Sequence, residues 1–223
     1  MKPGEYILGA AGDVPKDGQI ILFLRHSKRA SFQGVPDHLR HAAEITPEGV
    51  LLAREFGAAL GRFFPGRDLV LAHTPAVRCR MTAEYIGDGF SPEGHFRING
   101  GAPEVIDPVL DPHRFIELRE EIGWHRLMQK WLMDEISGSI LAPAGEYSRS
   151  QMRNLLSFTG AEKDILVVVG HDITLFPLVY HVMGRPLTTI GFLNGIVISV
   201  NGDRASVRFA DDEGLIRKEL DKW

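Results

Sequence analysis

The sequence has only one cysteine, Cys79, so the chain cannot form a disulfide bond within itself. This scarcity is typical of proteins from reducing compartments, and we expect a cytoplasmic location. Long apolar runs are missing too, because no stretch approaches the roughly 20 residues that a membrane-spanning helix needs. The first residues also lack the apolar segment of a secretory signal. These absences predict a soluble globular protein with no membrane partner.

Long runs of one charge are absent as well. The 25 lysines and arginines are interspersed with 29 acidic residues, for a formal net charge of -4. Nucleic acid is therefore a poor candidate for the main partner. With 223 residues, 44% of them hydrophobic, the chain is long enough for one α/β domain with a buried core. We predict a single domain over residues 1–223 with a cap-like helical insertion near residues 100–160, and the sequence leaves the oligomeric state open.

Short apolar runs predict β-strands. The most continuous run, residues 164–169, has the composition of a strand that is buried on both faces. Near the C-terminus, the pair Asn201-Gly202 predicts a hairpin turn between two strands. The predicted strands are residues 19–24, 68–73, 95–98, 164–169, 195–200 and 205–209, and the last two close the chain.

Helical patterns lie between these strands. Thr46 can cap a helix that has Pro47 in its first turn, and an apolar stripe continues from there to Phe63. Thr74 and Pro75 repeat this kind of start for a helix through about residue 86. Further helices are predicted over residues 112–136, over residues 147–158 and after Asp172, whereas residues 1–18 predict an irregular leader.

The alternation of strands and helices indicates the fold class. Parallel strands joined by helices form a sheet that is covered on both faces, and a terminal hairpin adds antiparallel strands at an edge. We predict an α/β protein, a three-layer αβα sandwich with a mostly parallel sheet, an antiparallel edge and a small helical cap.

Residues suited to binding phosphate gather at the carboxyl ends of three predicted strands. Ligands of open parallel sheets bind beyond these ends, so residues from different strands meet there. The candidates are Arg25, His26 and Arg29 after the first strand, His73 and Arg78 after the second, and His171 and Asp172 after residue 169.

This set matches the chemistry of phosphomonoester hydrolysis. Arginine binds two phosphate oxygens at once and keeps its proton. A neutral imidazole is a competent nucleophile at phosphorus, and nearby guanidinium charge lowers the pKa of a histidine and so keeps it neutral. A carboxylic acid can protonate the leaving oxygen. The reaction needs no metal and no other cofactor, and His38 and His41 have no further ligands near them in sequence that would predict a metal site.

Four segments resemble the histidine phosphatase superfamily, which has the phosphoglycerate mutase-like fold. The family's Arg-His-Gly-x-Arg-x-Pro is similar to residues 25–31, with Ser27 in place of glycine and Ser31 in place of proline. Its Leu-Thr-x-x-Gly helix start resembles residues 45–49. Its Ser-x-x-x-Arg segment resembles residues 74–83, and its late His-Asp pair resembles residues 171–172. The likeness is closest to the acid phosphatase and phytase branch.

The resemblance implies a role for each candidate. It makes His26 the nucleophile and Asp172 the proton donor, and it assigns phosphoryl binding to Arg25, Arg29, Arg78 and His171. His73 is a further candidate for substrate binding, or else a packed histidine. The other branch of the superfamily takes its acid from the segment after the second strand, so Glu104, Asp107 and Asp111 stay open as donors.

The sequence thus predicts a hydrolase, a metal-independent phosphomonoesterase that forms a phosphohistidine and releases phosphate from a small phosphorylated substrate. Two alternatives stay open. One is a phosphoglycerate mutase-like phosphotransferase, and the other is a catalytically silent domain that binds a phosphorylated ligand. The identity of the substrate is not predicted.

Overall fold

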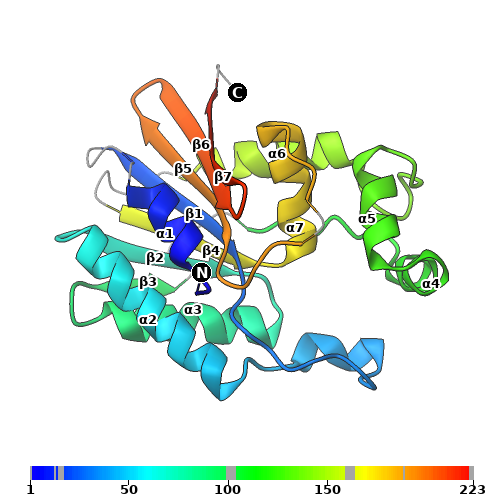
Figure 1. Cartoon of the computed structure of the whole chain (residues 1–223), viewed down its shortest axis with the longest axis horizontal. Coiled ribbons are helices and arrows are strands. Elements are labelled where there is room, and N and C mark those ends of the chain that lie inside the picture. The colour runs from blue at the N-terminus through cyan, green and yellow to red at the C-terminus, as the bar shows by residue number, and fades with distance from the viewer. Residues whose placement is uncertain are drawn as a thin grey trace.

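A seven-stranded mixed sheet forms the centre of the protein (Figure 1). The computed structural model describes residues 2–12, 14, 18–98, 104–158, 164–187 and 189–220. The strand order is β3-β2-β4-β1-β5-β6-β7; the first four strands are parallel and the last three form an antiparallel edge. The strands are β1 (Gln19–Arg25), β2 (Asp68–His73), β3 (Phe96–Ile98), β4 (Asp164–Gly170), β5 (Gly195–Asn201), β6 (Arg204–Asp211) and β7 (Gly214–Leu220). The predicted α/β class and sheet type are confirmed.

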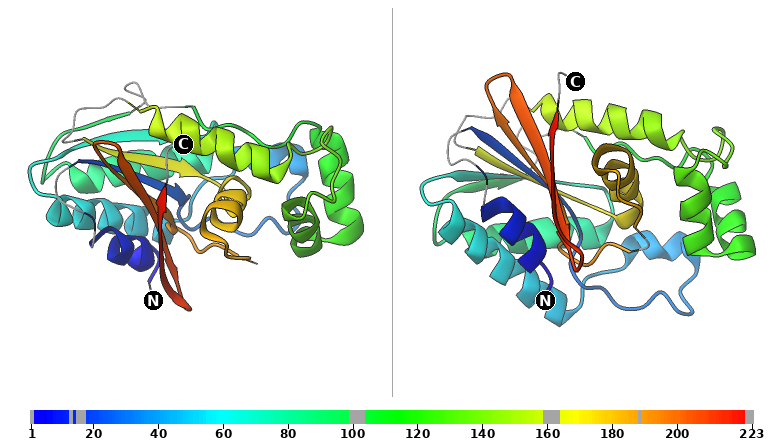
Figure 2. Two further views of the ribbon diagram at one scale, coloured as in Figure 1. Left: turned by 90° about the horizontal axis from the view of Figure 1, so that it is seen from above. Right: turned by 45° about the horizontal axis from the view of Figure 1, so that its top comes forward.

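Helices cover both faces of this sheet (Figures 1 and 2). One face packs against the first three α-helices, and the other against α5, α6 and α7. The helices are α1 (Glu5–Gly12), η1 (Asp37–Ala42), α2 (Pro47–Phe63), α3 (Val77–Phe90), α4 (Pro112–Ile122), α5 (Trp124–Leu132), α6 (Ala144–Leu156), α7 (Asp172–Pro177) and η2 (Leu178–Val182). None of the helices in the described part of the chain combines the length and the hydropathy that are required to span a bilayer.

Strands β1 and β4 are buried on both faces, and each supplies apolar side chains to the two cores on either side of the sheet. In β1, Ile20 and Leu22 pack on the side of α1–α3, and Ile21 and Phe23 pack on the opposite side. Alternate side chains of a strand point to opposite faces, so a continuous apolar run suits a central strand.

The strand register places the predicted site residues at one edge of the sheet. Arg25 pairs with Gly170 in the neighbouring parallel strands β1 and β4, and His73 of β2 pairs with Val169 of β4. The residues that follow these strands therefore leave the sheet side by side.

The prediction of an irregular leader over residues 1–18 is wrong, because this segment contains α1. Ile7, Ala10 and Ala11 of this helix are buried against the sheet. The glycines and prolines around these residues indicate irregular structure and outweigh the short apolar run in the sequence. Packing on the sheet stabilises a helix that is too short to be stable alone.

The C-terminal prediction is incomplete, since a third antiparallel strand, β7, follows β6. Its run Arg217-Lys218-Glu219 is exposed and lacks the alternation of a half-buried strand. Charges of this kind are common on edge strands, where they oppose pairing with other chains.

The predicted helix over residues 112–136 is two helices. Gly123 has a φ of 79° and separates α4 from α5, and α5 ends at Leu132. A left-handed backbone suits glycine and cannot continue an α-helix. The start of α2 was predicted correctly, because the Thr46 hydroxyl accepts a hydrogen bond from the Gly49 amide. Two members of the apolar stripe expected on α2, Leu51 and Phe63, are nevertheless exposed.

Candidate active site

His26 is buried at the carboxyl end of β1 with one ring nitrogen fixed. Its Nδ1 lies 2.7 Å from the Ser27 carbonyl oxygen. A carbonyl oxygen can only accept, so Nδ1 carries the hydrogen and the lone pair lies on Nε2. The His26 amide also donates to the Gly170 carbonyl oxygen at 3.0 Å, which attaches this residue to the end of β4.

His171 lies beside His26, with 5.5 Å between the two ring centroids. Its Nδ1 is 3.3 Å from Nη2 of Arg78, a group that can only donate, so this nitrogen accepts. The hydrogen is therefore on Nε2, which donates to the Thr74 hydroxyl at 3.1 Å. The ends of β2 and β4, together with α3, thus fix the orientation of the His171 ring.

The bond from His171 explains why the predicted helix start at Thr74 is wrong. Helix α3 begins at Val77, and its N-cap residue, Ala76, makes no side-chain cap. The Thr74 hydroxyl instead contacts His171. In the sequence, Thr74-Pro75 looks the same as Thr46-Pro47, which does begin a helix, so the pattern alone cannot distinguish a helix cap from a threonine that contacts another side chain.

Burial keeps both imidazoles neutral. Burial lowers the pKa of His26 to about 2, opposed by the hydrogen bond to Ser27 and assisted by His171, Arg78 and Arg25. Burial likewise lowers the pKa of His171 to about 3, and charges of nearby arginines act in the same direction. A neutral His26 has an available lone pair at any ordinary pH.

Arg25 lies between an aromatic ring and a carboxylate. Its guanidinium carbon is 4.6 Å from the ring centroid of Phe192, and its Nη2 is 3.4 Å from Oδ2 of Asp172. Its Nη1 donates to the Ile190 carbonyl oxygen. The Phe192 ring also lies 5.8 Å from the His26 ring. Phe192 belongs to a loop before β5, and no motif in the sequence indicated it.

Arg29 and Arg78 meet at a second aromatic ring, that of Phe32. The guanidinium carbon of Arg29 lies 3.4 Å from the ring centroid, and that of Arg78 lies 5.4 Å from it. Nη1 of Arg78 also donates to the Arg40 carbonyl oxygen at 2.8 Å. The loop after β1 therefore completes the site through Phe32 and Arg40, two residues that the sequence did not single out.

The three arginines share a further feature. The Nε atoms of Arg25, Arg29 and Arg78 are all buried and have no hydrogen-bond partner in the described part of the chain. A buried donor without a partner is costly, so such atoms are expected where a ligand supplies the acceptor. Three converging guanidinium groups suit the oxygens of a phosphoryl group.

Ser27, one of the two departures from the family motif, has a structural role. Its hydroxyl donates to the Gly49 carbonyl oxygen at 2.7 Å, and its amide donates to the Thr82 hydroxyl at 3.0 Å. The loop also runs close to α2, because a Cβ on Gly49 would lie 2.2 Å from the Lys28 carbonyl oxygen. Ser27 thus ties the loop after β1 to α2 and α3.

The carboxylate of Asp172 interacts with the arginines of the site. The pKa of Arg29 is lowered to about 10, chiefly by burial and then by the charges of Arg25 and Arg78, while Asp172 acts in the opposite direction. The three residues that carry the alternative carboxylates are exposed. Asp107 accepts from the Val109 amide and Asp111 caps α4, whereas the backbone carbonyl of Glu104 accepts from Asn154.

His73 lies at the same edge of the sheet, at the end of β2. Its Nδ1 lies 2.9 Å from the Thr74 carbonyl oxygen, and among the described residues its ring makes no hydrogen bond with the other candidates. Cys79 lies closer: its buried sulfur is 3.6 Å from Nε2 of His171. Burial raises the pKa of this thiol to about 12, which makes it a packing group and a weak nucleophile.

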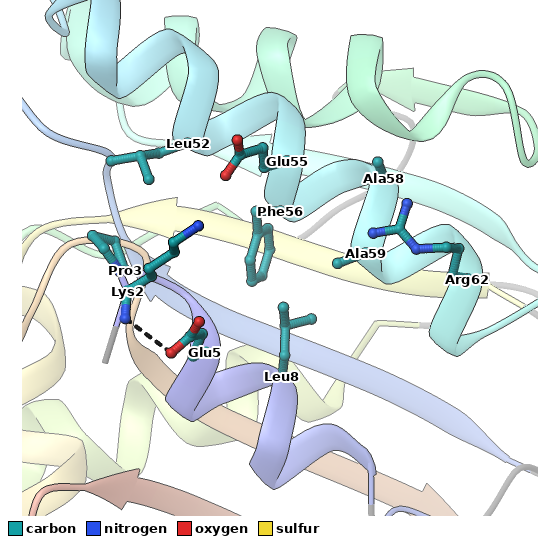
Figure 3. A pocket seen from close by; sticks show the side chains of 10 residues that line it. All are labelled: Lys2, Pro3, Glu5, Leu8, Leu52, Glu55, Phe56, Ala58, Ala59 and Arg62. Atoms are coloured by element: carbon teal, nitrogen blue, oxygen red, sulfur yellow. Dashed lines mark hydrogen bonds between the residues drawn. The ribbon is translucent and has the colours of Figure 1, made fainter.

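A hollow of about 370 Å³ lies elsewhere, between α1 and α2 (Figure 3). Leu8, Leu52 and Phe56 line it, with charged residues at its rim, and none of the predicted site residues does. Within the described ranges, no three histidine, cysteine, aspartate or glutamate side chains gather as a metal site.

Comparisons with solved structures identify the fold. A candidate alpha-ribazole-5'-P phosphatase from Escherichia coli K-12 is 18% identical, with a TM-score of 0.55, over 89% of this chain and 98% of that one. A mycobacterial glucosyl-3-phosphoglycerate phosphatase is 15% identical, with a TM-score of 0.51, over 92% of this chain and 97% of that one. The fold is that of the histidine phosphatase superfamily.

No protein-family model matches the sequence, and no curated relative does. At these identities the likeness to the histidine phosphatase fold concerns architecture alone. Membership of the acid phosphatase branch therefore stays a prediction.

Proposed function

We propose that the protein is a metal-independent phosphomonoesterase that works through a phosphohistidine on Nε2 of His26. The observation that carries this proposal is the neutral His26 ring, whose Nδ1 is bonded to Ser27 and whose Nε2 makes no hydrogen bond with the described residues. An imidazole held in this state at the end of a strand, beside three arginines, is suited to nucleophilic attack at phosphorus.

The arginines and His171 bind the phosphoryl group in this proposal. Arg25, Arg29 and Arg78 each have a buried Nε without a partner in the described part of the chain. The Nε2 hydrogen of His171, which Thr74 accepts in this structure, is shared with a phosphoryl oxygen when the ligand binds. These groups stay in place while negative charge is spread over the three equatorial phosphoryl oxygens and develops on the leaving oxygen, so they stabilise the transition state without reorganisation.

The reaction then has two balanced steps. Nε2 of His26 forms a bond to phosphorus while the ester P–O bond breaks, and Asp172 gives its proton to the leaving oxygen. A water next attacks the phosphohistidine, Asp172 takes up a proton from this water, and the P–N bond breaks to release phosphate. Asp172 is favoured by its position, because its carboxylate is 3.4 Å from Arg25 and its charge acts on Arg29 and Arg78, the groups that bind the phosphoryl group in this proposal.

A trapping experiment tests the proposal. The wild-type protein should form an acid-labile, base-stable phosphoprotein from a phosphomonoester, and His26→Ala should form none. The matched control is His95→Ala, which removes an exposed histidine before β3 and should keep full activity. If His26→Ala kept more than about a tenth of kcat, a barrier change below roughly 1.4 kcal/mol, His26 would not be the nucleophile.

The same assay separates hydrolysis from phosphotransfer. A phosphatase releases one phosphate for each substrate consumed, whereas a mutase-like phosphotransferase returns the phosphoryl group to an isomeric product. Binding of phosphate without turnover would instead indicate the silent binding domain.

A further inference from the structure

One phenylalanine ring contacts three guanidinium groups at the rim of the site. The ring centroid of Phe32 lies 3.4 Å from the guanidinium carbon of Arg29 and 5.4 Å from those of Arg40 and Arg78. The ring is half-buried, in the loop between β1 and η1. At 3.4 Å the guanidinium group of Arg29 lies against the ring, within the range of a cation–π contact.

The arginines need such a contact because they repel one another. After burial, the charges of Arg25, Arg78 and Arg40 all lower the pKa of Arg29, and the opposing carboxylate is Asp172. An additional carboxylate would order the arginines, but it would also repel a phosphate dianion. An aromatic face attracts cations through its quadrupole and carries no net charge. Phe32 can therefore order the arginines while their charge stays available to a ligand.

The loop holds the ring in place by its own hydrogen bonds. The Val35 amide donates to the Phe32 carbonyl oxygen at 3.0 Å, which closes a turn behind the ring. Nε of Arg40 donates to the Val35 carbonyl oxygen at 3.2 Å, and the Arg40 carbonyl oxygen accepts from Arg78 at 2.8 Å. One short segment thus presents the aromatic face and anchors the arginine that comes from α3.

From this geometry we infer that Phe32 is a positioning residue, which orders Arg29 and Arg78 for binding a phosphoryl dianion. What the inference implies for the rate of hydrolysis rests on the proposed function. What it implies for the affinity of the protein for phosphate can be measured even if the protein hydrolyses nothing.

The test measures binding of inorganic phosphate to the full chain by calorimetry. Phe32→Leu keeps an apolar side chain without a π face and should weaken phosphate binding about tenfold, because it removes the cation–π contacts to two half-buried arginines. Phe32→Tyr keeps the ring and should stay within about twofold of wild type. The matched control is Phe63→Leu, which changes an exposed phenylalanine of α2 and should bind phosphate as wild type does.

A double-mutant cycle shows whether Phe32 acts through Arg29. In the Arg29→Gln background, Phe32→Leu should weaken phosphate binding by less than about threefold, because the contact between the two side chains is already lost. Fully additive losses would mean a general effect on the loop and would overturn the inference. Equal impairment by leucine and tyrosine, or unchanged binding by the leucine variant, would overturn it too.

A trifluorinated phenylalanine at position 32 serves if the leucine variant does not fold. It nearly keeps the shape of the ring but weakens its quadrupole, so phosphate binding should weaken, and unchanged binding would contradict the inference. The two proposals fail separately. Phe32-dependent phosphate binding without hydrolysis would remove the proposed function alone, and hydrolysis together with phosphate binding that is insensitive to Phe32 would remove this inference alone.

Discussion

The hydroxyl oxygen of Thr74 and Nε2 of His171 lie 3.1 Å apart, although 97 residues separate them in the chain. The contact joins the carboxyl ends of β2 and β4 and orients the His171 ring. The tautomer is set at the other nitrogen, because Arg78 can only donate to Nδ1 and so leaves the hydrogen on Nε2.

Thr74→Val therefore tests whether the orientation of His171 matters for turnover. The substitution keeps the shape of the side chain and removes the acceptor, so kcat/KM for a phosphomonoester should fall about fivefold, the equivalent of one hydrogen bond of about 1 kcal/mol. Thr74→Ser keeps the hydroxyl and should stay within about twofold of wild type. Equal values for the two variants would show that the contact is only structural.

The depressed pKa values of the two histidines predict a loss of stability in acid. The folded-state pKa values are about 2 for His26 and about 3 for His171. As the pH falls below roughly 6.5, the unfolded chain takes up protons that the folded chain does not, so the free energy of unfolding decreases. Each histidine contributes at most about 1.4 kcal/mol per pH unit to this slope.

Urea unfolding of His26→Ala measures the contribution of one of them. Between about pH 6 and pH 4, in phosphate-free buffer, the free energy of unfolding should fall less steeply for the variant than for wild type. His95→Ala, which removes an exposed histidine, should follow the wild-type curve. Parallel curves for wild type and His26→Ala would mean that the pKa of His26 is the same in the folded and unfolded chains.

Chelation and phosphate mimics test the absence of a metal from the reaction. In the proposed mechanism the arginines supply the positive charge, so phosphatase activity should survive exhaustive dialysis against a chelator. Vanadate should inhibit competitively, because it adopts the geometry of the transition state. Loss of activity on chelation that a single divalent ion restores would contradict the mechanism.

The proton donor can be identified from the leaving group. Asp172→Asn should strongly slow hydrolysis of alkyl phosphates, whose alkoxides leave poorly, and should affect p-nitrophenyl phosphate much less, since its phenolate leaves without a proton. The high-pH limb of the rate profile should move or disappear in this variant.

The three alternative carboxylates provide the controls for this experiment. Glu104→Gln, Asp107→Asn and Asp111→Asn should show no dependence on the leaving group. If one of them did, while Asp172→Asn slowed both substrates equally, the donor would come from the segment before α4 and Asp172 would only position Arg25.

The sequence predicted those parts of the site that depend on strand ends. Arg25 and His26 follow a continuous apolar run, as His171 does, and parallel packing necessarily brings such ends together. Apolar periodicity also identified the strands that carry them. The pairing of Arg25 with Gly170 shows that this reasoning placed the two histidines correctly in space.

What the sequence did not predict depends on contacts between distant segments. Phe32 and Phe192 are ordinary loop residues in the sequence, and their roles appear only when arginines from other elements reach their rings. Thr74 has the pattern of a helix cap, and only the fold shows that His171 competes for its hydroxyl. Helix α1 and strand β7 were missed because burial on the sheet and edge pairing stabilise them, and neither has a local signal.

The central position of β1 has a consequence for how the protein opens. Amide hydrogens of β1 and β4 are hydrogen-bonded between buried layers, so they should exchange with solvent only when the whole domain unfolds. The edge strand β7 and the outlying helix α4, which buries no residue completely, should exchange through smaller openings. Local unfolding of β7 or α4 would then leave His26 and His171 side by side, because they follow β1 and β4, the strands whose amides exchange most slowly.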